Sequence, residues 1–400
     1  MNDTSEPAAG GIDHFIGNEG EFPVLGHGDF FNHAGVCPLP NAGADALRRY
    51  ARQAETVAYV DTGWHRDIAS LRASAAAMMN ASKEEVAFVK NTSEGISIVA
   101  TGVDWNAGDR VVTTAVEYPA NVYPWMELAR SRGVELVMVP EETAGDGSRH
   151  VPLEKILAAA DHPRTRMITL SHVEYASGQR HDLAAVGAFC RERNILFCVD
   201  AIQSLGVLPV DVKAMHVDYL SADGHKWLLG PEGAGVFYCR KELLERTRPA
   251  TLGWMNVVDA LNYGNYDYTL RPDAGRFECG SYNVPGLLAL KASVELLAGL
   301  GVGAVSRRIK ALTDRLVEGL GGKGYSIVSP RSGDQWSGIV SFVADDPAKH
   351  VGISKTLRAE HRTEIALREG RLRASPHLYN TEGQIDRLIH HLPGGGRSEI

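Results

Sequence analysis

The chain has 400 residues, which is long enough for one large and one smaller domain. Hydrophobic residues make up 44% and charged residues 22%, the usage of ordinary globular proteins, and this excludes a disordered, collagen-like or low-complexity chain. The net charge of −8 comes without any long basic run, so we expect no nucleic-acid partner and no membrane partner. Small-molecule chemistry is the better expectation.

The five cysteines are scattered along the chain and never form a CxxC pair. This pattern argues against a disulfide framework and against a metal site, and it fits a reducing compartment. The N-terminus lacks a basic start followed by an apolar block, and no apolar run reaches the length of a membrane span. We therefore expect a cytoplasmic protein.

In chain order, the polar, Gly-rich residues 1–27 are predicted to form an N-terminal arm. Apolar residues then recur at helical spacing from Asn41 to Met79, and Val86 to Val89 is predicted to be a strand that leads through a loop into a helix. This pattern repeats, with helical stretches such as LAAVGAFCRERN between the β-branched runs DRVVTTAVEY, VELVMVP, RMITLSHVEY, NILFCVD and VDYLSADGH. The alternation predicts an α/β fold with a mostly parallel, doubly wound sheet.

A loop-rich stretch follows this region, and a helical pattern then runs from Val284 to about Leu320. The last part of the chain holds the short strand patterns GYSIVSP, GIVSFVA and LRASPHLYN and the closing helix pattern EGQIDRLIHHLP. We therefore place a large domain at residues 28–290 and a small α+β domain at residues 291–400.

The most informative stretch is SADGHKWLLGPEGAG, where Lys226 follows His225 in a short polar turn. A lysine at a strand end can form a Schiff base if its surroundings keep part of it neutral, although a surface lysine is the alternative. Asp200 ends the apolar run NILFCV, with Gln203 three positions later. Such a carboxylate can hold a pyridinium nitrogen protonated, and Gln203 can contact a ring oxygen. The alternative for Asp200 is a helix N-cap.

Two further polar turns stand at strand ends. In VKNTSEGIS, Thr92 and Ser93 precede a helix whose N-terminal N–H groups can cradle a phosphate, although the same residues also fit a capping box. Tyr118, in VEYPANVYPW, can stack on a cofactor ring or simply pack in the core or on the surface.

Taken together, SHVEYASGQRHDL, VDAIQSLG, SADGHKWLLGPEGAG, RFECGSYN and LRASPHLYNT resemble the class V aminotransferase and cysteine desulfurase family, over about residues 28 to 392. The resemblance implies a fold-type I enzyme that uses pyridoxal phosphate. It implies that Lys226 forms the Schiff base, Asp200 pairs with the ring nitrogen, Gln203 contacts the ring oxygen and Tyr118 stacks on the ring.

The same resemblance implies that His225 holds the phosphate together with the Thr92 and Ser93 loop. Ser281 falls where family members contribute a phosphate contact from the neighbouring subunit, which implies a homodimer with shared active sites. Arg373 matches the arginine that clamps the substrate α-carboxylate, a task suited to a bidentate guanidinium. Without the match, Arg373 would be interpreted as a solvated surface charge.

The chain departs from the desulfurases at three places. Asp223 replaces a small hydroxyl residue three positions before the lysine, where it can point away, bind the Gly-rich turn or accept a proton from His225. The segment HRTEIALREGRL before Arg373 has no cysteine to attack a substrate sulfur. Tyr175 replaces an asparagine, which suggests a cofactor contact from a phenol near the imine.

We therefore expect a class V aminotransferase that acts on a small α-amino acid. The alternatives are a C–S lyase that cleaves cysteine, cystine or a cysteine conjugate by β-elimination, and an amino-acid epimerase. All three would use the same residues, so the sequence separates them poorly. A non-catalytic binding protein that keeps the fold is a further alternative.

Overall fold

A computed structural model of the chain describes residues 11–396. The predicted arm at residues 1–27 is thus described from Gly11 onward, and residues 1–10 of it lie outside the described part. Within the arm, Phe15 and Phe22 are buried in a core to which both domains contribute, and Phe22 stacks on Tyr379 of the small domain. Apolar side chains, together with the backbone hydrogen bond from the Gly17 N–H to the Tyr379 carbonyl at 2.9 Å, therefore fasten this part of the arm to the body.

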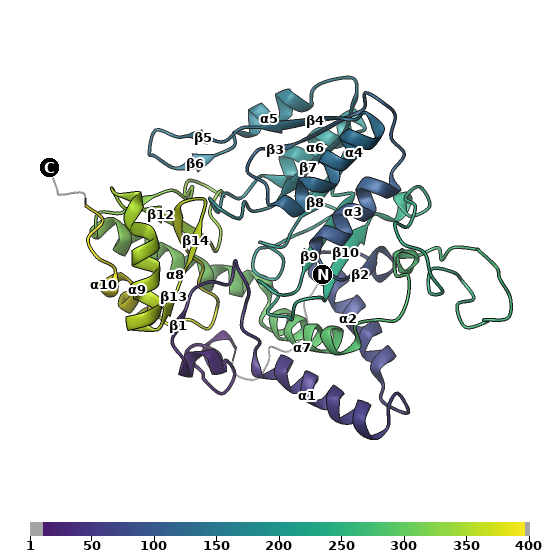
Figure 1. The fold of residues 1–400 in the computed structure, drawn as a ribbon, viewed down its shortest axis with the longest axis horizontal. Helices are drawn as coiled ribbons and strands as arrows, with labels where there is room; N and C mark the ends of the chain where they lie inside the picture. Colours follow the sequence, from purple (N-terminus) through teal and green to yellow (C-terminus); the bar gives the residue numbers. More distant parts are fainter. Residues whose placement is uncertain (1–10, 397–400) are drawn as a thin grey trace.

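The centre of the molecule is a seven-stranded sheet (Figure 1). Its strands, in spatial order, are β2 (Val86–Val89), β10 (Gly235–Cys239), β9 (Tyr219–Asp223), β8 (Leu196–Asp200), β7 (Thr165–Ser171), β3 (Arg110–Thr114) and β4 (Glu135–Val139). The only antiparallel pairings are those of β10 with β2 and β9. This arrangement confirms the predicted mostly parallel sheet.

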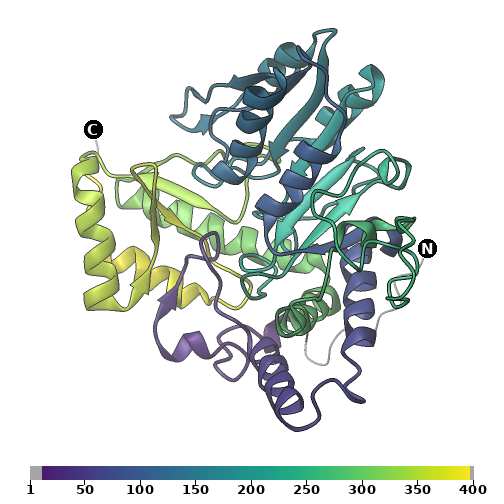
Figure 2. The same cartoon turned by 45° about the vertical axis from the view of Figure 1, so that its right-hand side comes forward.

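Alternate residues of the strands face two different cores, as expected for a sheet that is covered on both sides. Val112 and Ile168 belong to one core, whereas their neighbours Val111 and Met167 belong to the other. Figure 2 shows the helices on the two sides of the sheet. One core includes α3 (Thr92–Gly102) and α4 (Tyr123–Arg132), and the other includes α2 (Trp64–Met78), α5 (Leu153–Ala160), α6 (Leu183–Arg193) and α7 (Val284–Leu300).

A second, smaller sheet lies beside the large domain, in the yellow and green part of Figure 1. Its strands, in order, are β11 (Ser326–Ile327), β12 (Val340–Val343), β15 (Arg371–Ala374) and β14 (Ala366–Arg368). Three helices share its core, namely α8 (Val302–Gly322), α9 (His350–His361) and α10 (Glu382–His391). Strand β1 (Asp29–Phe30) pairs in parallel with β13 (Thr363–Glu364), so the chain just after the arm joins the small domain.

The helical pattern that we predicted from Val284 to about Leu320 is two helices, because Gly301 lies between α7 and α8 with a φ of 76°. Helix α7 packs on α1 (Asn41–Thr56) and α2, and it continues across the predicted domain boundary between residues 290 and 291. Within residues 11–396 no single helix is long and apolar enough to cross a membrane, and only the pair of α7 and α8, bent by 84°, reaches that length and composition together.

The remaining elements are short. A two-stranded hairpin is formed by β5 (Glu142–Thr143) and β6 (Arg149–His150). The described 3₁₀ turns are η1 (Ile12–His14), η2 (Pro23–Gly26), η3 (Lys83–Glu85), η4 (Pro119–Asn121), η5 (Lys241–Leu243), η6 (Ala274–Phe277) and η7 (Pro347–Lys349).

The hairpin of β14 and β15 turns on two residues, Glu369 and Gly370, whose φ angles of 47° and 71° are both positive. Two positive φ angles in a two-residue loop are the mark of a type I′ turn, which matches the twist of the strands. Side chains alternate along a strand and directly opposed residues share a face. Arg368, Arg371 and Arg373 therefore lie on one face of this hairpin.

Gly370→Ala should destabilise the protein by about 1–2 kcal/mol, because an L side chain at positive φ is strained. Gly352, in helix α9, is the matched control. A Cβ at either position meets no atom within 4 Å, and only Gly370 has a positive φ. Gly352→Ala should instead stabilise the protein by about 0.5–1 kcal/mol. Urea unfolding followed by circular dichroism measures both, and equal effects would contradict the assigned turn.

Candidate active site

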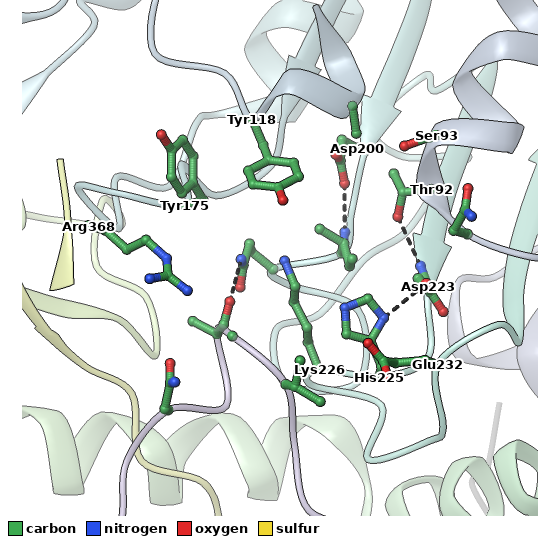
Figure 3. A pocket seen from close by; sticks show the side chains of 18 of the residues that line it. Thr92, Ser93, Tyr118, Tyr175, Asp200, Asp223, His225, Lys226, Glu232 and Arg368 are labelled. Atoms are coloured by element: carbon green, nitrogen blue, oxygen red, sulfur yellow. Dashed lines mark hydrogen bonds and ion pairs between the residues drawn. The ribbon is translucent and has the colours of Figure 1, made fainter. Parts of the chain in front are cut away.

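A cavity of about 590 Å³ lies at the carboxyl ends of strands β8 and β9, beside the start of α3 (Figure 3). Loops at this edge of a parallel sheet are where α/β proteins bind ligands. The cavity is lined by all but one of the residues that the sequence singled out: Thr92, Ser93, Tyr118, Tyr175, Asp200, Gln203, His225, Lys226 and Arg373. Residues more than 280 positions apart in the chain are thus brought together.

Lys226 sits in the turn after β9 with its side chain buried. Its Nζ lies 5.4 Å from the centre of the Tyr118 ring, and Figure 3 shows the amine pointing into the cavity below that ring. Burial lowers the pKa of the amine to about 8, and Asp200 opposes the effect while Arg373 adds to it. Part of the amine is therefore neutral near pH 7, as a nucleophilic lysine requires.

The lysine turn is fixed by its neighbours. The Nε1 of Trp227 donates a hydrogen bond to Oε1 of Gln203 at 2.8 Å. The amide nitrogen of Gln203 in turn donates to the carbonyl of Ala34 at 3.0 Å. Gln203 therefore lines the cavity with its side chain already held by two bonds.

Asp200 is the last residue of β8 and is almost fully buried. Its Oδ1 accepts a hydrogen bond from the backbone N–H of Ile202 at 2.9 Å, and a series of turns follows instead of a helix. The helix N-cap alternative therefore does not describe this residue. Burial raises the pKa of the carboxyl to about 6, and the nearby Lys226 partly offsets this rise.

The start of α3 closes one end of the cavity. Its N-cap is Asn91, whose Oδ1 accepts the Glu94 N–H, so neither Thr92 nor Ser93 serves as the cap. The hydroxyl of Thr92 instead accepts a hydrogen bond from the backbone N–H of Asp223 at 3.1 Å. The hydroxyls and free N–H groups at this helix start offer an anion site.

Asp223 has two of the roles that the sequence left open. Its Oδ1 accepts the N–H of Gly224 at 2.7 Å, and its Oδ2 lies 2.9 Å from Nδ1 of His225. The Asp223 carboxylate therefore orients the His225 ring beside the helix start. Figure 3 shows Asp223 and His225 on the same side of the cavity as Thr92.

Arg373 is 1% exposed, and it is held by hydrogen bonds to the carbonyl of Tyr175 at 2.6 Å and to Oδ1 of Asn32 at 3.3 Å. Within residues 11–396 its guanidinium makes no ion pair with a carboxylate, and its Nε has no hydrogen-bond partner. Burial and the neighbouring Arg368 lower its pKa to about 9. A buried cation without a counter-charge calls for an anionic ligand.

Tyr175 differs from the hypothesis of a phenol near the imine. Its hydroxyl donates a hydrogen bond to Oε1 of Glu369 at 2.8 Å, in the turn of the β14–β15 hairpin. Burial and this carboxylate raise the pKa of the phenol to about 12. The ring of Tyr175 meets that of Tyr118 edge-to-face at 5.2 Å between centroids. Tyr175 therefore lines the cavity with its ring while its hydroxyl is held at the hairpin.

Ser281 lies outside the cavity of its own chain. It lines a separate hollow of about 360 Å³ that Gly233, Cys279 and Asn283 also line. Its predicted contribution to the site of a neighbouring subunit stays a prediction.

Several lining residues were not predicted from the sequence, among them Asn32, Glu232 and Arg368. The only signal for Arg368 was the glycine between two alternating segments in ALREGRLRA, because Gly at the second loop position suits a two-residue hairpin. That hairpin puts Arg368 on the same face as Arg373.

Residues 42–388 match the aminotransferase class-V family. A probable cysteine desulfurase from Methanothermobacter thermautotrophicus is 31% identical over 394 residues, which cover 92% of this chain and 94% of the relative. A probable cysteine desulfurase from Pyrococcus abyssi is 31% identical over 78% of this chain and 79% of its own length.

Among solved structures, the complex of the cystine C–S lyase C-DES with its product cysteine persulfide is similar with a TM-score of 0.85 and 26% identity, covering 94% of this chain and all of that one. A C-DES variant with glycine covalently linked to its PLP cofactor is similar with a TM-score of 0.86 and 25% identity, covering 95% of this chain and 100% of that one. This chain belongs to the aminotransferase class-V family and has the fold of the fold-type I pyridoxal-phosphate enzymes.

Proposed function

We propose that this protein is a pyridoxal-phosphate-dependent C–S lyase that cleaves a cysteine-type amino acid, such as cystine, by β-elimination. The observation that carries the proposal is that none of the described residues lining the cavity is a cysteine. The relatives are named for chemistry at carbon–sulfur bonds, and a lyase needs no thiol of its own to perform such chemistry. The sequence by itself favoured transamination, and the relatives favour the lyase alternative.

The thiol of Cys37 also supports this choice. Cys37 lies close to the cofactor turn, since its N–H donates to the carbonyl of His225 at 2.8 Å. Its side chain is buried beside the carbonyl of Gly230, and burial raises the pKa of the thiol far above its ordinary value. Such a thiol is a poor nucleophile and does not face the cavity.

The cavity fits the cofactor part by part. Hydroxyls and N–H groups at the start of α3, with His225, suit a phosphate. Asp200 suits a protonated ring nitrogen, Gln203 suits the ring oxygen, and Lys226 is the amine for the aldehyde carbon. The buried, unpaired Arg373 supplies the charge that a substrate carboxylate would meet.

Each side chain then has a defined task. When bound, pyridoxal phosphate supplies an electron sink for the pair left on the substrate Cα. Asp200 keeps the ring nitrogen protonated, and Arg373 fixes the α-carboxylate so that the Cα–H bond faces Lys226. The neutral amine of Lys226 accepts this proton. The Cβ–S bond breaks, sulfur leaves with both electrons as a persulfide from cystine, and water converts the remaining three-carbon unit to pyruvate and ammonium.

Arg368 indicates which substrates fit. It is a second guanidinium in the cavity, and within residues 11–396 it forms no ion pair with a carboxylate. In Figure 3 it points toward Lys226 from the side of Tyr175. A substrate with a second carboxylate beyond the sulfur, as in cystine, would reach this group while Arg373 holds the first.

The deciding experiment records the absorbance of the protein loaded with pyridoxal phosphate, before and after addition of cystine, cysteine or alanine, with pyruvate assayed in parallel. We expect the cofactor band to persist while pyruvate accumulates from cystine, and Lys226→Ala to abolish both band and product. Conversion of the cofactor to its aminated form without pyruvate would instead establish the aminotransferase. Deuterium uptake at Cα with retained amino acid would establish the epimerase.

Arg368→Gln should raise the KM for cystine by about 10- to 100-fold, because a charge-assisted hydrogen bond is worth about 1.5–3 kcal/mol. The KM for a cysteine thioether without a second carboxylate should stay unchanged. Arg371→Gln is the matched control on the same hairpin, since Arg371 pairs with Glu141 and does not line the cavity. Equal losses for both substrates would show that Arg368 does not sense the second carboxylate.

We also propose a cytoplasmic homodimer with shared active sites. The loop that holds Trp254, Tyr263, Tyr266 and Tyr268 exposes these aromatic rings and extends from the body at the right of Figure 1. Exposed aromatic surface of this kind is typical of an interface. Light scattering should give twice the mass of the chain, and Ser281→Ala should weaken cofactor binding. A monomeric protein with full cofactor affinity would contradict the shared site.

A further inference from the structure

A row of buried acidic groups continues behind Asp200, away from the cofactor cavity. Ser171 ends β7 and pairs in register with Asp200, and it donates hydrogen bonds from its N–H and its hydroxyl to Glu117 at 2.6 Å and 2.5 Å. Glu174 lies further along, where its Oε1 accepts a hydrogen bond from the Thr114 hydroxyl at 3.0 Å. All three carboxyls are buried.

Glu174 forms a pair with His181. The Oε1 of Glu174 and the Nε2 of His181 are 3.0 Å apart, and both side chains are at most 3% exposed. The other carboxyl oxygen of Glu174 has no hydrogen-bond partner within residues 11–396. Burial raises the pKa of Glu174 to about 8 and lowers that of His181 to about 4, so the pair holds one proton at neutral pH.

A second cavity, of about 580 Å³, reaches the pair from the other side. His181 and His172 line it, together with Gln179 and Arg180. Arg180 is already paired with Asp334 across the mouth of this space. His181 therefore stands between this cavity and the buried carboxyl of Glu174.

Three neighbouring carboxylates cannot all be ionised in a buried place without strong repulsion. Besides burial, the Asp200 carboxylate raises the pKa of both Glu117 and Glu174, and Glu174 also raises that of Glu117. The other carboxylate that acts on Glu174 is Glu141, which is paired with Arg149 and Arg371. His172 is neutral, because burial lowers its pKa to about 3. A proton on Glu174 therefore leaves Asp200 free to carry the negative charge.

We propose that Glu174 and His181 are positioning residues that hold one proton behind Asp200 and thereby set the charge that Asp200 presents to the cofactor ring nitrogen. The proposal rests on the proposed cofactor, whereas the proton itself is held by the protein alone. Ionisation of Glu174 would add a negative charge near the ring and stabilise the protonated cofactor. The second cavity gives the pair its exchange with water through His181.

The first test needs no cofactor. Folded Glu174 keeps its proton up to about pH 8, whereas the unfolded chain loses it near pH 4.5, so folding stability falls as pH rises through this range. His181 acts oppositely, but only below about pH 6.5. Between pH 6.5 and 8, Glu174→Gln should therefore reduce the pH slope of the unfolding free energy by nearly one proton. Glu85→Gln, a buried carboxylate on a distant cap, is the matched control and should leave the slope unchanged.

The second test titrates the visible absorbance of the loaded protein. Glu174→Gln removes the negative charge that ionised Glu174 would place near the cofactor ring. The midpoint of the absorbance titration should therefore move to lower pH by about half a unit or more, whereas Glu85→Gln should not move this midpoint. If Glu174→Gln fails to fold, His181→Gln is tested instead. The glutamine amide would favour ionised Glu174, so the pH range in which the unfolding free energy falls should move to lower pH. The proposal would be overturned if Glu174→Gln changed the pH slope of the unfolding free energy but left the midpoint of the absorbance titration unmoved. It would also be overturned if neither quantity changed. A parent protein without any visible band would overturn the cofactor assignment alone.

Discussion

Two opposite charges buried in one cavity, the Lys226 amine and the Asp200 carboxylate, are the interaction on which the site depends. Burial disfavours the charged form of each group, and each group supports the charged form of the other. The result is an amine with a pKa of about 8 and a carboxyl with a pKa of about 6, both close to neutrality. A reactive amine and an anionic partner for a ring nitrogen can therefore coexist near pH 7.

The small domain completes the cavity that the sheet begins. Three of its serine hydroxyls donate to consecutive carbonyls of the loop that carries Tyr175: Ser341 to Ala176, Ser329 to Ser177 and Ser337 to Gly178. The same loop holds Arg373 through the Tyr175 carbonyl and is held at the hairpin through the Tyr175 hydroxyl. The loop, the small sheet and the buried guanidinium thus form one connected support, which fixes the distance between Arg373 and Lys226.

The predictions that held were those in which a local pattern fixes a position in space. Lys226 and Asp200 each follow a strand pattern, and parallel strands bring their carboxyl ends to one edge, so their meeting follows from the alternation of strands and helices. The partner of the Tyr175 hydroxyl lies 194 residues further along the chain, and no local pattern connects the two. Helix α7 continues past residue 290, where we predicted the domain boundary, and it packs on α1 and α2, a tertiary contact that no local pattern shows.

The arrangement of charge in the cavity bears on substrate choice. Arg368 and Arg373 reach the cavity from the small-domain hairpin. In Figure 3, Arg368 and Asp223 lie on opposite sides of Lys226, and Asp223 is on the side of the start of α3. Lys226 would be occupied by its covalent bond to the cofactor, so the two guanidiniums would remain for the carboxylates of a substrate. Arg373 is fully buried and needs a carboxylate in any substrate, whereas Arg368 is partly exposed and water can solvate it. A second substrate carboxylate should therefore affect affinity more than turnover, because the orientation of the Cα–H bond depends on Arg373 alone.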